Sequence, residues 1–285
     1  TFVAMGRYGG RECSYASDAD VIALHEAVGG ASDSEAAASA TAIVNRVKKL
    51  LGSATSQLGI VVDLDLRPEG KNGPMSRTIA SHEEYAQRWA STWERQAAVR
   101  ARPIGDGGLA QAARSLFESM AYRDVSEAEV RDIRLLKARM ENERLPRGTE
   151  PARHVKLGPG GLSDVEWTIQ LIQMRHGREV EALRTSSTTD AIAAARDAGL
   201  LGASDAEILL NAWDLATRIR AGNTLATGRM SGVKLDVVPR DSAELGALAA
   251  ILGYGSGGLT ALEEDWLRAA RQARGVMERT FWEQQ

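Results

Sequence analysis

Two pairs of aspartates, each with its members two residues apart, have the types and spacing that best suit metal chemistry. They are Asp18 with Asp20 and Asp63 with Asp65. Side chains alternate along a β-strand, so both members of a pair would point to the same side. Three or more carboxylates on one surface repel one another unless a cation lies among them. Mg²⁺ prefers such oxygen ligands, although a single Asp-x-Asp also occurs at solvated strand starts and helix caps.

A glycine-rich turn lies just before the first pair. Gly6, Gly9 and Gly10 follow an apolar run over residues 1–5. Glycine lets the backbone come close to a ligand, and backbone N–H groups in such a turn can bind phosphate. We expect the Gly9 and Gly10 amides to hold the β- and γ-phosphates of a nucleoside triphosphate, beside one or two Mg²⁺ ions. Gly-Gly alone is equally common as a plain turn.

Strand and helix signals alternate over the first hundred residues, which is what would place both aspartate pairs on one sheet. Apolar runs predict strands over residues 1–5, 20–25 and 59–66. Helical spacing after the N-cap Ser34 predicts a helix that ends at Gly52.

Turn formers fill residues 67–74, and beyond them the spacing of apolar residues predicts helices almost throughout. Trp89 and Trp93 lie four residues apart, so we expect them on one helix face in the core. A soft domain boundary falls near residues 105–125. The predicted helical segments are residues 80–101, 107–122, 126–145, 162–176, 187–198, 204–222, 241–252 and 260–283.

The composition excludes several classes of protein. The 285 residues are 44% apolar and 26% charged with a net charge of -3, which argues against a nucleic-acid-coating protein. No stretch approaches the roughly 20 apolar residues of a membrane-spanning helix, and residues 1–5 do not begin a secretory leader. The single cysteine, Cys13, excludes a disulfide within the chain and favours a reducing, cytoplasmic location. Because Thr1 is not an initiator Met, we expect the chain to be a piece of a longer protein.

The order of these features resembles the DNA polymerase beta-like nucleotidyltransferase superfamily. In that superfamily a strand and a Gly-Gly turn precede an Asp-x-Asp strand, a helix and a third strand with a carboxylate. The resemblance implies an α+β fold, in which a small nucleotidyltransferase mixed sheet with flanking helices is followed by a helical bundle. It places a catalytic domain at residues 1–115 and a helical domain at residues 116–285.

A more specific resemblance, to bacterial glutamine synthetase adenylyltransferases, covers most of residues 1–176 and continues more loosely beyond. Members of that family carry two catalytic halves, one that attaches AMP to a tyrosine of glutamine synthetase and one that removes it. Ser163 and the residues after it resemble the C-terminal, AMP-attaching half. The blocks that carry the resemblance are Gly9-Gly10-Arg11-Glu12, Ser17-Asp18-Ala19-Asp20, Asp65-Leu66-Arg67-Pro68-Glu69-Gly70, Trp93-Glu94-Arg95-Gln96-Ala97, Arg100-Ala101-Arg102-Pro103, Lys156-Leu157-Gly158-Pro159-Gly160-Gly161 and Asp164-Val165-Glu166-Trp167.

The family's catalytic metal positions carry over onto Asp18, Asp20 and Asp63. Asp65 stands where many relatives have Arg, and it is either a further metal ligand or an ordinary neighbour. Gly160 and the glycine after it could present N–H groups to a phosphate or simply form a tight turn, and the roles of Asp164 and Glu166 stay open. The residues expected at the ATP phosphates are Gly9, Gly10, Ser17, Arg67, Lys71, Arg100 and Arg102, and each basic one could instead lie on a solvated face.

The reaction that the resemblance implies is Mg²⁺-dependent transfer of AMP from ATP to a tyrosine hydroxyl of glutamine synthetase, which regulates nitrogen assimilation. Pyrophosphate leaves, and Asp63 is the expected acceptor of the tyrosine proton. Two alternatives stay open: the deadenylylating half, which removes AMP by phosphorolysis to ADP, and a non-catalytic helical regulatory module. A small-molecule nucleotidyltransferase is disfavoured by the long helical second half. The implied partners are glutamine synthetase and a PII-type nitrogen-signalling protein, with no nucleic acid and no membrane.

Overall fold

A computed structural model describes residues 1–15, 17–52, 59–255 and 258–283, and the chain divides into two compact units. Unit 1 consists of Thr1–Cys13, Ser17–Asp124 and Met174–Ser187. Unit 2 consists of the described residues of Ser14–Ala16, Val125–Gln173 and Thr188–Gln285. No helix among the described residues is both long enough and apolar enough to cross a bilayer.

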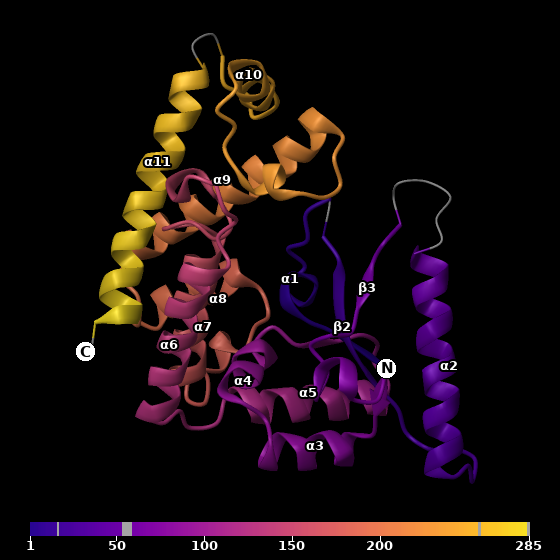
Figure 1. The fold of residues 1–285 in the computed structure, drawn as a ribbon. Coiled ribbons are helices and arrows are strands. Elements are labelled where there is room, and N and C mark those ends of the chain that lie inside the picture. Colours follow the sequence, from indigo (N-terminus) through magenta and orange to yellow (C-terminus); the bar gives the residue numbers. More distant parts are fainter. Residues whose placement is uncertain (16, 53–58, 256–257, 284–285) are drawn as a thin grey trace. The chain divides into compact units, whose positions relative to one another are not determined.

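The sheet of unit 1 is small and mixed, and it confirms the predicted α+β class. β1 (Phe2–Ala4) lies between β2 (Ala19–Leu24) and β5 (Arg102–Pro103) and is antiparallel to both. β3 (Val62–Asp63) and β4 (Ser76–Arg77) each pair with β2 in parallel. Figure 1 shows β2 and β3 side by side, with a long helix along the outer side of β3.

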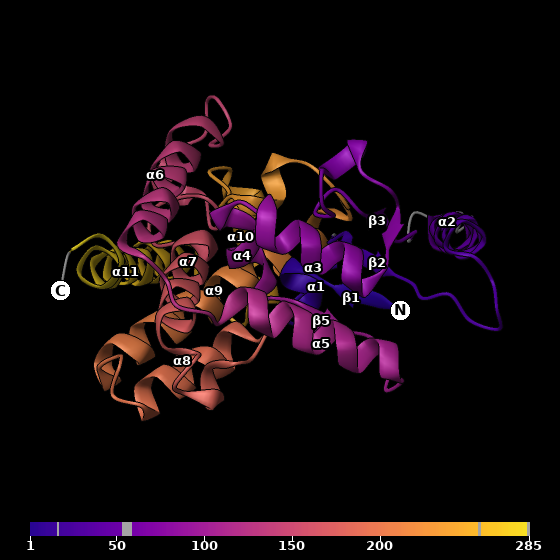
Figure 2. The same cartoon turned by 90° about the horizontal axis from the view of Figure 1, so that it is seen from below.

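The helices of unit 1 lie around this sheet. The four-residue helix α1 (Gly6–Gly9) joins β1 to the segment before β2, and α2 (Asp33–Gly52) follows β2. α3 (Ile79–Arg88) and α4 (Thr92–Ala98) both pack against α5 (Gly108–Ala121), which in turn lies against β1 and β5. Figure 2 shows α3 and α5 beside these strands.

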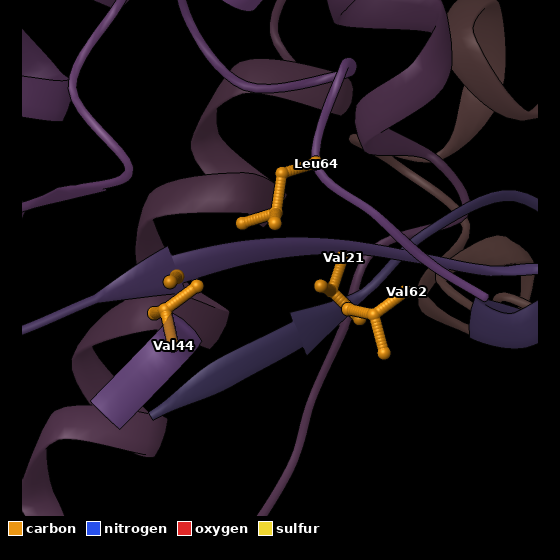
Figure 3. Packing of buried hydrophobic residues seen from close by; sticks show 5 residues of the cluster. Val21, Val44, Val62 and Leu64 are labelled. Atoms are coloured by element: carbon orange, nitrogen blue, oxygen red, sulfur yellow. The ribbon is translucent and has the colours of Figure 1, made fainter. Parts of the chain in front are cut away.

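The helix α2 is held to the sheet by one small apolar cluster. Val44 of α2 is buried with Val21 of β2, Val62 of β3 and Leu64, as Figure 3 shows. Burying side chains of this size stabilises the contact by roughly 1.5–3 kcal/mol each. Because Val62 directly precedes Asp63, this cluster also fixes the end of β3 that carries the carboxylate.

The predicted start of α2 was wrong by one or two residues. Ser34 lies inside the helix, which begins at Asp33. The capping residues are Ser32 and Glu35: the Ser32 N–H donates to Glu35 Oε2, and the Glu35 N–H donates to Ser32 Oγ. This reciprocal pair satisfies two N–H groups at the helix start, which a cap at Ser34 could not do.

The third strand is much shorter than the predicted residues 59–66, of which β3 covers only two. Asp63 Oδ1 accepts a hydrogen bond from the Asp65 N–H at 2.6 Å. An aspartate side chain that bonds the backbone two residues on turns the chain, and this bond takes Asp65 off the sheet. Residues 53–58 lie outside the described part of the chain.

The predicted helix over residues 80–101 is two helices. Ser91 and Glu94 form a capping box that starts α4 three residues after the end of α3. Trp89 and Trp93 therefore lie on different elements, and their expected place in the core was wrong, because they are 73% and 41% exposed.

Unit 2 is helical. Its longest helix, α9 (Ala203–Thr227), packs against α8 (Thr188–Asp197), α10 (Ser242–Ile251) and α11 (Gly258–Met277). α6 (Glu127–Glu143) begins with a capping box formed by its N-cap serine and its third residue. α7 (Leu162–His176) begins in unit 2, and a π-helical turn, Glu278–Trp282, follows α11.

The predicted end of α9 at Gly222 was wrong. A Cβ atom at Gly222 would lie 2.6 Å from Leu248 Cδ1, so this glycine allows α10 to pack closely against an uninterrupted helix. The helix ends five residues later, before Gly228, which has a left-handed conformation with φ of 65°.

Candidate functional site

Three aspartates from neighbouring segments of unit 1 come together at one edge of the sheet. Asp20 of β2 and Asp63 of β3 are directly paired in the parallel register, and Asp18 lies just before β2. One carboxylate oxygen of each residue lies within 4.8 Å of those of the other two. Asp18 is exposed, and Asp20 and Asp63 are half-buried. We call Asp18, Asp20 and Asp63 the carboxylate trio.

The trio is chemically suited to a hard divalent cation. Neither Asp18 nor Asp63 has a Lys or Arg ion-pair partner among the described residues, so their charges are not neutralised from within the chain. Three carboxylates this close repel one another, and a divalent ion with oxygen ligands relieves that repulsion. The donor set therefore fits Mg²⁺.

Asp65 does not join the trio. It follows β3 in a turn, where its carboxylate lies 3.3 Å from Lys71 Nζ and 3.8 Å from Arg67 Nη1. The expected alternation of Asp63 and Asp65 on one strand face was wrong because the strand ends at Asp63. Lys71 is largely exposed, and Asp65 is the acid within ion-pair distance of it.

The glycine turn forms a short helix, and its N–H groups are not arranged as we expected. The Gly9 N–H donates to the Met5 carbonyl at 2.7 Å, and the Gly10 N–H donates to the Gly6 carbonyl at 3.2 Å. These amides are therefore used within α1 rather than presented as a phosphate nest. A Cβ atom at Gly9 would lie 1.9 Å from the Arg100 carbonyl oxygen, so glycine is needed there for packing.

Gly6 is the glycine that meets the trio. It has a left-handed φ of 50°, which favours glycine, and a Cβ atom at this position would lie 3.0 Å from Asp20 Oδ2. The Met5 N–H, one residue earlier, donates to the Asp20 carbonyl at 2.9 Å. The start of α1 thus lies directly beside the carboxylate of Asp20.

The arginines that we expected at phosphates also hold backbone. Arg100 is buried, its Nε donates to the Gly6 carbonyl at 3.1 Å, and it forms an ion pair with Glu12. Arg102 donates to the carbonyls of Gly9 at 2.8 Å and Tyr8 at 3.1 Å. Both guanidinium groups therefore bind carbonyls of α1 and tie this short helix to residues 100–102.

Arg67 has a similar role in the loop after β3. Its Nη1 donates to the Leu64 carbonyl at 2.8 Å and its Nε to the Gly73 carbonyl at 3.2 Å. These bonds close the loop that contains Asp65. They follow from the same property of arginine, a planar fork of several donors that can bridge separate backbone segments.

Ser17 lies next to the trio and forms a hydrogen bond with the thiol of Cys13. Burial raises the pKa of Cys13, and the negative charges of Asp18 and Asp20 raise it further against the opposing effects of Arg7 and Ser17. A raised pKa keeps the thiol protonated at neutral pH, which does not suit a nucleophile.

Two family models match the chain: the glutamate-ammonia ligase adenylyltransferase model over residues 1–116 and the GlnD PII-uridylyltransferase model over residues 134–281. Bifunctional glutamine synthetase adenylyltransferase/adenylyl-removing enzymes of Streptomyces coelicolor and Streptomyces avermitilis are 46% and 47% identical to it over 283 residues, 98% of this chain. The enzyme of the same name from Bifidobacterium longum subsp. infantis is 46% identical over 100% of the chain.

The chain belongs to the glutamine synthetase adenylyltransferase family. It spans 28% of the length of the two Streptomyces enzymes and 27% of the Bifidobacterium enzyme. The match to the adenylyltransferase model covers the sheet, the carboxylate trio and the arginines that hold α1. The match to the uridylyltransferase model covers most of unit 2.

A buried group of two acids and two cations in this member of the family lies in unit 2, and three of its four members were missed in the sequence. Asp164 and Lys137 are each 1% exposed, and Lys137 Nζ lies 2.6 Å from Asp164 Oδ1 and 3.2 Å from Glu141 Oε1. Arg274 Nη1 lies 3.1 Å from Asp164 Oδ2 and 2.8 Å from Glu141 Oε1. We call Lys137, Glu141, Asp164 and Arg274 the Asp164 cluster.

The Asp164 cluster also explains the glycine-rich turn before α7. The Gly160 N–H donates to Asp164 Oδ2 at 2.8 Å, and the Gly161 N–H donates to the Gly158 carbonyl at 2.9 Å. Gly160 has a φ of 73°, and a Cβ atom there would lie 1.8 Å from the Ala270 carbonyl oxygen. The turn therefore packs closely against α11, and the N–H groups of Gly160 and Gly161 already have acceptors within the chain.

Lys137 had a signal in the sequence. It lies seven residues after Val130 and four after Ile133, on the buried face of the amphipathic helix α6. A lysine on such a face is buried only with an acidic partner. Glu12 had a weaker signal: it belongs to one of the blocks that carry the resemblance, but no role was assigned to it.

Proposed function

We propose that this chain transfers AMP from ATP to a tyrosine hydroxyl of glutamine synthetase and releases pyrophosphate, with one or two Mg²⁺ ions at Asp18, Asp20 and Asp63. The observation that carries the proposal is the convergence of the trio's oxygens within 4.8 Å of one another, in a chain of this family. The relatives described above are named for two activities, transfer of an adenylyl group and its removal.

The chain's own residues contribute position and charge. Asp18, Asp20 and Asp63 would hold the ions, whose chemistry when bound is to stabilise negative charge on the triphosphate. Arg100 and Arg102 hold α1 so that the backbone at Gly6 stays beside Asp20. Most of the acceleration in phosphoryl and nucleotidyl transfer comes from such positioning and charge stabilisation.

The bond changes of the proposed step balance without another reactant. The tyrosine oxygen forms a bond to the α-phosphorus of ATP as the bond to the bridging β-phosphate oxygen breaks. Pyrophosphate leaves, and the tyrosine proton passes to Asp63, the member of the trio on the edge strand of the sheet. We further propose that the catalytic domain is residues 1–115 and the helical domain residues 116–285, and that Ser17 and Lys71 contact the nucleotide.

Removal of AMP by phosphorolysis to ADP is the second candidate, because the relatives are named for both activities. The trio would serve either direction. The match of residues 134–281 to a PII-uridylyltransferase model supports a PII-type signalling protein as a further partner. The chain has one cysteine and so cannot form an internal disulfide, which is consistent with a protein of the reducing cytoplasm.

The test is transfer of label from [α-³²P]ATP to purified glutamine synthetase in the presence of Mg²⁺. We expect labelling of one tyrosine, and a loss of at least about a thousandfold in Asp20→Asn and Asp63→Asn. Asp106→Asn, a change at an exposed loop aspartate, is the matched control and should keep full activity.

Three results would contradict this proposal in different ways. Release of ADP from pre-labelled glutamine synthetase with phosphate, without attachment from ATP, would assign the removing reaction. Unchanged labelling in Asp20→Asn and Asp63→Asn would separate the trio from the chemistry. No reaction in either direction, with the chain still binding glutamine synthetase, would favour a non-catalytic module.

A further inference from the structure

A pocket of ≈ 180 Å³ lies within unit 1, away from the three carboxylates. Its wall is formed by the segment from α4 to β5, by α5 and by residues 184–186. Figure 2 shows α4 and α5 near one another. We call it the arginine pocket, after the charged residues that line it: Arg102, Arg114 and Arg184, with Glu118 as the acid.

The charge of the pocket is unbalanced. Three arginines and one acid line it, and among the described residues Arg114 has neither a hydrogen bond nor an ion pair. Arg114 and Glu118 lie four residues apart on α5 and still form no ion pair. An excess of positive charge in a concave site attracts anions and raises their local concentration.

Two of the arginines are fixed in place before any ligand binds. Arg184 donates to the carbonyls of Gly177 at 2.7 Å and Arg178 at 2.8 Å, and Arg102 donates to the carbonyl of Gly9 at 2.8 Å. Each uses Nε and Nη2 for these backbone bonds, which leaves Nη1 for another acceptor. A guanidinium held in this way loses little freedom when it binds an anion.

Tyr122 adds a hydroxyl donor to the pocket. It is 8% exposed, and its hydroxyl has no hydrogen-bond partner among the described residues. Burial raises the pKa of the Tyr122 phenol, and the charge of Glu118 raises it further against the opposing charge of Arg184. The hydroxyl therefore stays protonated and can donate to an anion in the pocket.

We propose that the arginine pocket binds a compact phosphate dianion, either inorganic phosphate or the phosphate group of a small ligand. The pocket volume of ≈ 180 Å³ leaves room for a group of this size. Arginine forks match phosphate oxygens in geometry as well as in charge. This inference goes beyond the proposed function, because none of the trio lines the pocket.

The experiment is calorimetric titration of the whole chain with inorganic phosphate, at low ionic strength and without divalent metal. We expect saturable binding that weakens as salt is raised. Arg114→Gln should weaken it about tenfold, because a hydrogen bond to a charged group is lost from an exposed position that the fold does not need. Arg46→Gln, the same change at an exposed site on α2, is the matched control and should bind as the wild type does.

A second variant changes the affinity in the opposite direction. Glu118→Gln removes the one acid of the pocket, so we expect tighter binding of phosphate. Asp20→Asn should bind phosphate as the wild type does, whether or not the proposed AMP transfer is correct. Loss of binding in Asp20→Asn, equal affinity in Arg114→Gln and Arg46→Gln, absence of saturable binding, or tighter binding of succinate than of phosphate would each overturn the assignment.

Discussion

The carboxylate trio and the Asp164 cluster use the same acidic side chains in opposite ways. In the cluster two carboxylates meet two cations of the chain itself, and Asp164 and Lys137 are 1% exposed. In the trio three carboxylates meet at the sheet edge, and neither Asp18 nor Asp63 has a cationic partner among the described residues. The charges of the cluster are balanced within the chain, and the trio is arranged so that a cation could bind among its carboxylates.

Burial explains why the two sites differ. Taking a charge out of water costs several kcal/mol unless a partner replaces the water, so a buried carboxylate is retained only with its cation and hydrogen bonds. Asp164 has both, from Lys137, Arg274 and the Gly160 N–H. Asp18 is exposed, so water and mobile ions can solvate it until a divalent ion binds.

Breaking the cluster should give the largest change in stability. Lys137→Met leaves Asp164 buried with less compensation, and Asp164→Asn leaves Lys137 with the half-buried Glu141 as its remaining acid partner. Each change should lower the free energy of unfolding by about 3–5 kcal/mol. Urea denaturation of the variants measures this loss.

The double variant tests whether the loss comes from the pair. In Lys137→Met with Asp164→Asn no unpaired lysine remains, so the loss should be smaller than the sum of the two single losses. Lys49→Met, at an exposed site on α2, is the control and should change stability by less than about 0.5 kcal/mol. Strictly additive losses would show that the cluster is not an interacting group.

Adding a divalent ion should separate the two sites. Because binding to the native state alone stabilises it, Mg²⁺ or Mn²⁺ at about 100 times its dissociation constant should raise the free energy of unfolding by roughly 2.7 kcal/mol. Asp63→Asn should remove most of this gain, whereas Asp106→Asn should keep it. Thermal unfolding with and without the ion is the measurement, and an equal gain in both variants would place the ion elsewhere.

The carboxylates of the trio also show which parts of the site could be predicted from the sequence and which could not. Asp20 and Asp63 were assigned from the resemblance, and the apolar runs placed them on separate strands, which the structure pairs in register. The position of Asp65 outside the trio could not be predicted in this way, because the Asp63 side chain bonds the backbone and ends the strand. The Asp63 side chain competes with strand pairing for the backbone N–H of Asp65, and the apolar residues around Asp63 do not indicate which of the two wins.

Arginine roles could not be predicted from residue type. Arg100 and Arg102 were expected at phosphates, and the structure shows a second role for them, because they donate to the carbonyls of α1. Those carbonyls become available only when residues 100–102 lie beside α1, about ninety positions away in the chain. Lys137 and Arg274 likewise meet Asp164 only through tertiary packing, although the helical spacing of Lys137 with Ile133 indicated that it is buried.

The smallest effect concerns pH and Glu141. Burial alone would raise the pKa of Glu141, but the hydrogen bond and charge of Arg274 and the charge of Lys137 outweigh it, and the pKa lies below the ordinary 4.5. A carboxyl whose pKa is lowered in the folded state adds stability above its ordinary pKa, and that stability is lost as the pH falls through the lowered value. Because the side chain is 27% exposed, its contribution should be less than about 1 kcal/mol.

Glu141→Gln should therefore be slightly less stable than the wild type at pH 7, and the difference should shrink as the pH falls below the ordinary pKa of 4.5 and through the lowered pKa of the folded state. In the metal-free trio the same kind of change has the opposite sign. Asp18→Asn removes one of three mutually repelling charges, so it should leave the stability at pH 7 unchanged or slightly raised. Urea denaturation of both variants across this pH range decides the matter. A loss at pH 7 in Asp18→Asn as large as in Glu141→Gln would mean that the trio, too, is neutralised by the chain itself.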